Sequence, residues 1–187
     1  MSEIQCFLIE PTEECEVRLR RFVFSDSCPA KAGYHNASSG PLWREPFPLS
    51  NTFNGDHTGR HDHADARWPV ECECGYVFQE SDQWQVCRER LYKRADTGEQ
   101  LTQKSAPAGA MWDDTWRKDI GFKWYTVQPD GYLLTVKTPD GEWCIDGPAN
   151  NGGGWTRTGT VPRVTAMPSI LSGSYHGWLT DGVLREC

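Results

Sequence analysis

Two Pro-Asp-Gly triplets, at residues 129–131 and 139–141, constrain the fold of this chain most strongly. Proline fixes φ ahead of a turn, and Asp-Gly accepts the left-handed backbone that tight hairpin turns require. Apolar residues alternate with polar ones on both sides of the second triplet. The apolar positions are Leu134, Val136, Trp143 and Ile145. This pattern predicts a hairpin of two half-buried strands.

Similar patterns predict strands elsewhere. Residues 177–184 are expected to form a hairpin that turns at Asp181-Gly182. Residues 4–24 are predicted to form a hairpin at the start of the chain, because Pro11 and Thr12 separate two runs with high β propensity. Residues 81–104 fit a short helix or a hairpin, and the Asp-Thr-Gly turn chemistry within 95–98 favours the hairpin. Residues 105–116 are expected to connect the two halves, with one helical turn within 110–116.

The composition agrees with a turn-rich β protein. The chain has 187 residues with 18 glycines and 12 prolines, which argues against long helices. Only 37% of the residues are hydrophobic, but nine are tryptophans, so large rings must supply much of the core. We therefore predict a mainly β, hairpin-rich single domain over residues 1–187 with long irregular loops. Its expected sub-lobes are a metal-held half, 1–104, and a β-hairpin half, 105–187.

The segment 25–69 is rich in Gly, Pro, Asn, Asp and His and has little periodicity. A loop of this length is uncommon in a compact domain unless it is functional, disordered or held by another group. A bound metal ion is one group that could hold it, and it would add folding free energy that a core poor in aliphatic residues lacks.

A metal site is predicted around Cys72-Glu73-Cys74-Gly75, which directly follows this segment. Two closely spaced thiolates supply half of the four ligands that a structural zinc ion requires. The preferred partners are Cys28 and His35, which are seven residues apart in a glycine-containing loop. A buried strand with two thiols on one face remains the alternative reading. Other ligand candidates are His57, His61, His63 and Cys87.

Charge and hydropathy exclude several classes of function. The net charge is −7 and the pI is about 5.2, and the basic stretches 18–21 and 88–94 alternate with apolar residues. Binding to nucleic acid is therefore not expected, because it depends on neutralising phosphates. No apolar run approaches the ~18 residues of a membrane-spanning helix. The start of the chain lacks the pattern of a secretory signal peptide, so we expect reduced cysteines in a cytoplasm.

Catalytic motifs are sparse. The sequence contains no G-x-S-x-G, P-loop, G-x-G-x-x-G or H-E-x-x-H motif. His61-x-His63 could belong to a hydrolytic metal site. Asp113 and Asp114 could form the carboxylate pair of a sugar-cleaving site, although neighbouring residues of a strand point to opposite faces. We therefore predict no catalytic residues.

Eight segments stand in a distinctive order along the chain. They are "CFLIEPT", "LRRF", "CPAKAGYHNAS", "RWPVECECGYVF", "LYKRADTGE", "PAGAMW", "GYLLTVKTPDGEWCID" and "SILSGSYHGWLTDGVL". In this order they resemble uncharacterised proteins of tailed bacteriophages and prophages, particularly those of actinobacteria. The resemblance covers most of the chain and implies a phage origin without implying an activity. In those proteins a longer Cys- and His-containing stretch follows "GEW", whereas "GPANNGGGWTRTG" here contains neither residue type.

These features together predict a non-enzymatic phage protein. The first reading is a zinc-stabilised accessory of the virion, such as a capsid-decoration or tail-associated component, whose partners are phage structural proteins. Tryptophans would anchor its contacts. An alternative is an early phage protein that binds a host protein in the host cytoplasm, and a second alternative is a small metal-dependent hydrolase. The candidate contact residues are Trp112, Trp116, Trp155 and Trp178.

Overall fold

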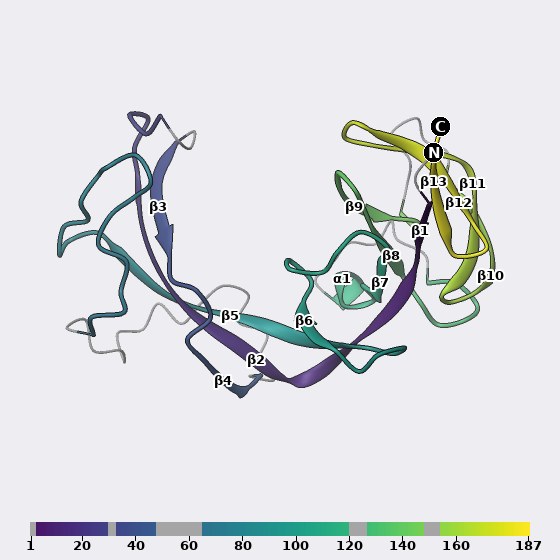
Figure 1. Cartoon of the computed structure of the whole chain (residues 1–187), viewed down its shortest axis with the longest axis horizontal. Coiled ribbons are helices and arrows are strands. Elements are labelled where there is room, and N and C mark those ends of the chain that lie inside the picture. Colours follow the sequence, from purple (N-terminus) through teal and green to yellow (C-terminus); the bar gives the residue numbers. More distant parts are fainter. Residues whose placement is uncertain (1–2, 30–32, 48–64, 120–126, 148–153) are drawn as a thin grey trace. The chain divides into compact units, whose positions relative to one another are not determined.

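The computed structural model of the chain describes residues 3–29, 33–47, 65–119, 127–147 and 154–187. The predicted mainly β, hairpin-rich fold is confirmed, since nearly all its elements are strands (Figure 1). The strands form two hydrogen-bonded sheets. The long segment expected to be irregular also contributes two short strands, β3 (Tyr34–Ser38) and β4 (Trp43–Pro46), which both pair with β2 (Phe7–Phe24).

The chain divides into two compact units. Unit 1 consists of Met1–Pro11 and Tyr92–Cys187, and unit 2 consists of Thr12–Leu91. The sub-lobes expected from the sequence divide instead between residues 104 and 105. The first residues belong with the C-terminal part because β1 (Glu3–Gln5) pairs with β13 (Val183–Glu186), the last strand of the chain.

The predicted hairpin within residues 4–24 is wrong. The segment forms the short strand β1 and then β2, a single strand of 18 residues that continues through Pro11. Proline has no backbone N–H to donate. The next residue, Thr12, is hydrogen-bonded to Arg90 and Leu91. The Thr12 hydroxyl donates to the Leu91 carbonyl over 2.9 Å, and Arg90 Nε donates to the Thr12 carbonyl over 2.8 Å.

A five-stranded antiparallel sheet belongs to unit 1. Its strand order is β1-β13-β12-β11-β10. The predicted hairpin at 177–184 is confirmed, because β12 (Tyr175–Thr180) and β13 join through Asp181 and Gly182, which have φ of +47° and +73°. The neighbouring strands are β10 (Thr156–Thr160) and β11 (Arg163–Ser172).

The second sheet has the strand order β6-β5-β2-β7-β8-β9. The hairpin predicted at the second Pro-Asp-Gly triplet is confirmed as β8 (Leu134–Thr138) and β9 (Gly141–Cys144). The favoured hairpin around 95–98 is also confirmed. It joins β5 (Gln83–Arg94) to β6 (Gln100–Thr102).

The expected helical turn within 110–116 is a strand instead. β7 (Ala110–Asp113) pairs with β8 and, in parallel, with the start of β2, and the one-turn helix α1 (Trp116–Asp119) follows. The buried pattern of β7 explains the difference, because Ala110, Met111 and Trp112 are all fully enclosed by apolar neighbours. Tertiary burial on both faces therefore overrides the local sequence pattern.

Each unit has its own apolar core. In unit 1, β8, β9 and the five-stranded sheet supply the largest cluster of buried residues, which includes Leu134, Ile170 and Leu179. In unit 2, Val17 and Leu19 of β2 pack with Val86 of β5 and with Trp68. Trp68 also meets Trp84 edge to face, with ring centroids 4.9 Å apart. The tryptophans thus supply part of the core, as the low aliphatic content requires.

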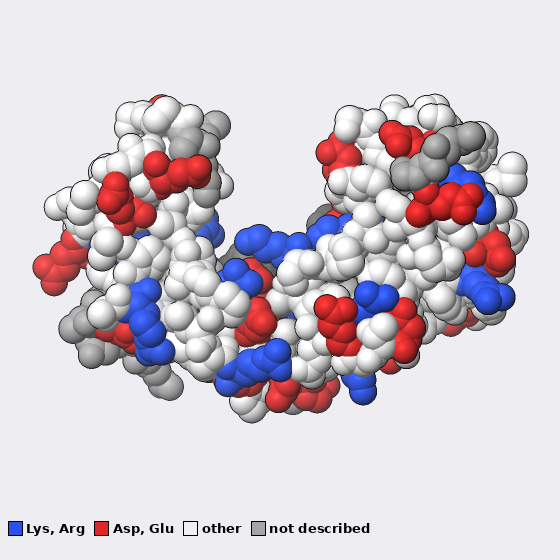
Figure 2. Space-filling view, in the orientation of Figure 1, with Lys and Arg blue, Asp and Glu red and all other residues white. Residues whose placement is uncertain are grey.

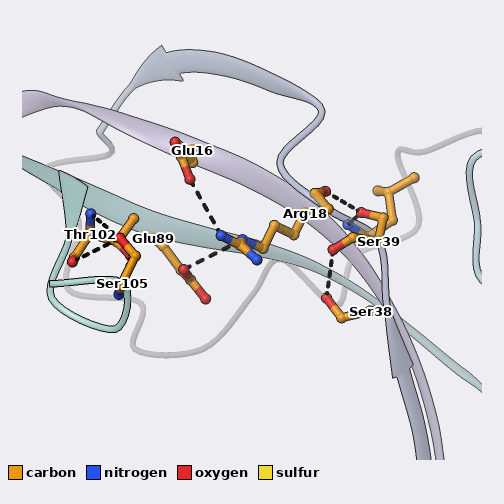
Figure 3. A network of polar contacts seen from close by, with 9 residues as sticks. Glu16, Arg18, Ser38, Ser39, Glu89, Thr102 and Ser105 are labelled. Carbon is orange, nitrogen blue, oxygen red and sulfur yellow. Dashed lines mark hydrogen bonds and ion pairs between the residues drawn. The ribbon is translucent and has the colours of Figure 1, made fainter. Parts of the chain in front are cut away.

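Arg18 of the first basic stretch is paired with carboxylates within unit 2. It lies 3.5 Å from a carboxylate oxygen of Glu16 and 3.5 Å from one of Glu89 (Figure 3). The Ser39 hydroxyl next to it accepts a hydrogen bond of 2.9 Å from the backbone N–H of Leu19. Figure 2 shows acidic and basic side chains interspersed on the face in view.

Candidate metal centre

Four side chains of unit 2 meet at one point. Cys28, His35, Cys72 and Cys74 each offer one ligand atom, and these atoms all lie within 4.8 Å of one another. Cys28, His35 and Cys72 are buried, and Cys74 is half-buried. The four residues come from two segments that are separated by more than thirty positions in the sequence. The structure thus brings together the preferred ligand set of the sequence analysis, and this cluster could hold a metal ion.

The Cys-x-Cys-Gly sequence forms the turn of a small hairpin over residues 70–78. Glu71 and Val77 form an antiparallel bridge, and the Cys72 N–H donates to the Tyr76 carbonyl over 2.8 Å. The Gly75 N–H donates back to the Cys72 carbonyl over 2.9 Å. Gly75 has a φ of +88°, which glycine adopts without steric cost. The glycine therefore lets the backbone turn sharply enough for both thiols to face the same point.

The other two ligands flank the connection from β2 to β3. His35 is the second residue of β3 and pairs with Val23 of β2. Its Nδ1 lies 3.2 Å from the Cys74 sulfur, and its Nε2 lies 3.4 Å from the Ser27 hydroxyl. Cys28 follows Ser27 directly. Nδ1 thus faces the cluster and Nε2 faces the Ser27 hydroxyl. Metal-binding imidazoles usually bond to a neighbouring group through the nitrogen that does not bind the metal.

Hydrogen bonds shift the acidity of the two closely spaced thiols in opposite directions. Burial alone would raise the pKa of Cys72, but backbone hydrogen bonds from Cys74 and Asn36 and side-chain hydrogen bonds with Cys74 and His35 lower it to about 6. At Cys74, the backbone hydrogen bond from Tyr76 lowers the pKa, and burial together with the neighbouring thiols Cys72 and Cys28 raises it overall. The hydrogen bonds around Cys72 thus favour its thiolate, which is the form of cysteine that binds metal ions.

The remaining candidate ligands do not join the cluster. Cys87 is a half-buried residue of β5 and is not one of its four members. His57, His61 and His63 lie outside the described residues, so the alternative histidine ligands and the hydrolytic His61-x-His63 arrangement stay predictions. In the part of the chain that the structure describes, no other group of three or more such side chains converges.

The tryptophans proposed as contact residues differ in exposure. Trp112 is only 1% exposed, and its Nε1 donates to Asp114 over 3.1 Å, so its assignment as a surface contact is wrong. It lies in the doubly covered strand β7. Trp155 packs against the core and against Trp143. Trp116 and Trp178 are 37% and 42% exposed, so part of each side chain lies at the surface.

Asp113 and Asp114 act as structural acceptors. The buried Asp114 carboxylate accepts hydrogen bonds from Trp112, Trp116, Thr135 and Arg117. Asp113 Oδ1 accepts from the backbone N–H groups of Thr115 and Leu133 and from the Thr115 hydroxyl. Both oxygens of Asp114 and one oxygen of Asp113 thus bind groups within unit 1.

Sequence reasoning missed the residues that surround the ligands. Ser27 bonds to Nε2 of His35, and the Tyr76 ring stacks on the imidazole at a centroid distance of 4.1 Å with an interplanar angle of 8°. Their only indication in the sequence is proximity, since Ser27 precedes Cys28 and Tyr76 follows the Cys-x-Cys-Gly turn.

Neither a membrane-spanning helix nor a similar known protein gives a further indication of function within the described residues. In the described ranges, no helix is long and apolar enough to cross a membrane. Comparisons of the chain with models of protein families, with curated proteins and with solved structures found no match.

Proposed function

We propose that Cys28, His35, Cys72 and Cys74 bind one structural zinc ion. The observation that carries this proposal is the convergence of their four ligand atoms within 4.8 Å. Three sulfurs and one imidazole nitrogen form a Cys₃His set, which is one of the common tetrahedral sets of structural zinc. Soft thiolate ligands also favour zinc over magnesium or calcium, which prefer oxygen.

A structural role is favoured over a catalytic one because the protein supplies all four ligands. A catalytic zinc ion keeps one position open for water or substrate, whereas a structural ion has a closed set of protein ligands. Cys28, His35 and Cys72 are buried, so a fifth ligand from solvent has little access. This distinction supports a non-enzymatic protein over the small metal-dependent hydrolase.

The zinc ion would replace a hydrophobic core in this part of unit 2. The apolar cluster around the site contains only Cys28, Cys72 and Phe78 as buried members. Structural zinc binding contributes apparent free energies of about 10–16 kcal/mol in small zinc-finger peptides. An ion bound here would thus join the hairpin 70–78 to the end of β2 and to β3, where apolar burial is small.

We further propose that the protein is an accessory component of a tailed-phage virion, either a capsid-decoration or a tail-associated protein. The ordered series of segments that resembles phage proteins supports the origin. The exposed side chains of Trp116 and Trp178 suit contacts with phage structural proteins, because tryptophan is enriched in binding hot spots. A host protein bound in the cytoplasm is the alternative partner.

Elemental analysis tests the zinc proposal. We expect one zinc ion per purified chain, and its loss in Cys28→Ser and Cys72→Ser, because each variant removes one of four ligands. Cys87→Ser is the matched control, since Cys87 lies outside the cluster, and it should retain the full zinc content. A wild-type protein without zinc, or loss of zinc from the control alone, would contradict the proposal.

Copy number in purified particles tests the virion proposal. We expect quantitative mass spectrometry of the phage that encodes this chain to find it at a fixed ratio to the major capsid protein after gradient purification. An early non-structural protein of the same phage serves as the control and should be removed by the gradient. Removal of this chain to the same degree would favour the host-binding alternative and leave the zinc proposal intact.

A further inference from the structure

The ligand His35 is held on one face by an aromatic ring. The rings of His35 and Tyr76 are nearly parallel, with 4.1 Å between their centroids. The last torsion of a histidine side chain has a broad energy minimum, so the backbone alone does not fix the direction of Nδ1. A ring stacked at this distance restricts that rotation. The contact therefore bears directly on whether Nδ1 stays beside the Cys74 sulfur, 3.2 Å away.

Tyr76 is itself fixed by a buried carboxylate. Its hydroxyl donates to Oδ2 of Asp82 over 3.1 Å, and the backbone N–H of Gln79 donates to the same oxygen over 2.7 Å. Asp82 is only 8% exposed. The ring of Tyr76 also meets Phe78 edge to face, with centroids 5.6 Å apart. The phenol therefore has one hydrogen bond and two ring contacts that define its position.

Arg21 of β2 completes this arrangement. Its guanidinium lies over the Trp84 ring, 3.6 Å from the centroid, and 5.3 Å from that of Phe78. Arg21 also donates to the carbonyl of Gln79, the residue whose N–H bonds to Asp82. Burial lowers the pKa of Arg21, and the charge of Asp82 opposes that shift. Arg21 and Asp82 thus both bond to the backbone of Gln79, which directly follows the ligand-bearing hairpin.

We propose that Tyr76 and Asp82 form a positioning pair that fixes the imidazole of His35 for metal binding. Asp82 orients the Tyr76 phenol, and the Tyr76 ring orients the imidazole. This inference depends on the proposed metal site, but it assigns roles to two residues that are not ligands. Partners outside the ligand shell typically change metal affinity by about 10–100-fold when they are removed.

A double-mutant cycle tests the pair. Tyr76→Phe keeps the stacked ring and removes only the hydroxyl, and Asp82→Asn removes the charge that holds it. We expect each variant to bind zinc at least about 10-fold more weakly in chelator competition. The double variant should lose no more zinc affinity than the single variant that binds zinc more weakly, because the two residues act through one hydrogen bond. Additive losses would overturn the proposal.

A second measurement separates positioning from general stability. At saturating zinc, ¹⁵N NMR of the imidazole should show one metal-bound Nδ1 signal for His35 in the wild type and a broadened or second signal in Tyr76→Phe. Val17→Ala, in the core of unit 2, should lower stability without changing that signal. Tyr132→Phe, in unit 1, should alter neither affinity nor signal.

The outcomes distinguish this inference from the zinc proposal. A wild-type protein that binds no zinc would contradict both the zinc proposal and the positioning pair. A wild-type protein that binds one zinc ion, together with an unchanged His35 signal and unchanged affinity in Tyr76→Phe, would overturn only the positioning roles. If Val17→Ala changes the His35 signal as much as Tyr76→Phe does, the change would be due to lower stability, and the positioning roles would again be overturned.

Discussion

Removing zinc with a strong chelator is expected to unfold the metal-binding part of unit 2 while unit 1 stays folded. All four ligands belong to unit 2, and the apolar cluster beside them is small. Unit 1 contributes no residue to this cluster, and the largest apolar cluster among its described residues has twelve buried members. The loss of stability should be several kcal/mol, since structural zinc contributes about 10–16 kcal/mol in peptides that fold only with metal.

Hydrogen exchange resolved by segment measures this selectivity. After chelation, amides in residues 70–82 and in β3 should exchange at rates near those of an unfolded chain. Amides of β11 and β12 should keep their protection. Adding zinc again should restore the protection of residues 70–82 and of β3. Cys72→Ser should reproduce the chelated state without chelator, and Cys87→Ser should not. Loss of protection in both units together, or in neither, would contradict the expectation.

Asp114→Asn is expected to lower the free energy of unfolding of unit 1 by about 3–5 kcal/mol, the range found when one partner of a buried charged network is removed. Asp114 is 1% exposed and receives donors from two tryptophans, a threonine and Arg117. An amide offers one acceptor oxygen in place of two. In either orientation its NH₂ group would face a donor that cannot accept a hydrogen bond, either the two indole N–H groups or Arg117. Arg117 would also lose its counter-charge.

Denaturant unfolding followed by exchange of the β8 amides measures this loss. Asp181→Asn is the matched control, because Asp181 is exposed in a turn at a φ of +47°, which asparagine also tolerates. It should change the stability by no more than about 0.5 kcal/mol, as surface substitutions usually do. Equal losses in the two variants would show that the buried network contributes nothing specific. Zinc affinity should be unaffected by either substitution, since both residues belong to unit 1.

The parts of the fold that local sequence determines could be predicted. The hairpins at residues 139–141 and at Asp181-Gly182 depend on turn chemistry and on alternation over a few neighbours, and both are present. The preferred ligand set was also predictable, because Cys-x-Cys-Gly leaves two positions of a tetrahedral site to fill. The long segment before it offered Cys28 and His35, and also His57, His61 and His63, so the sequence favoured this set without deciding among the ligands.

The parts that depend on distant partners could not be predicted. Pro11 indicates a break when it is read locally, yet bonds from Arg90 and to Leu91 keep the strand continuous at Thr12. The same limit applies to Trp112, which belongs to a strand covered on both faces. The residues around the ligands were missed for a related reason. Stacking on His35 is a property of the folded hairpin and not of a spacing in the sequence.

The pairing of β1 with β13 has a consequence for how the protein is made. Unit 2 lies between the two parts of unit 1 in the chain, so a ribosome completes residues 12–91 before most of unit 1 exists. The five-stranded sheet must wait for residues 183–186 before its β1 edge can form. Unit 2 can therefore fold and bind the proposed metal ion while the nascent chain is still growing, and unit 1 can close only when synthesis has reached its last strand.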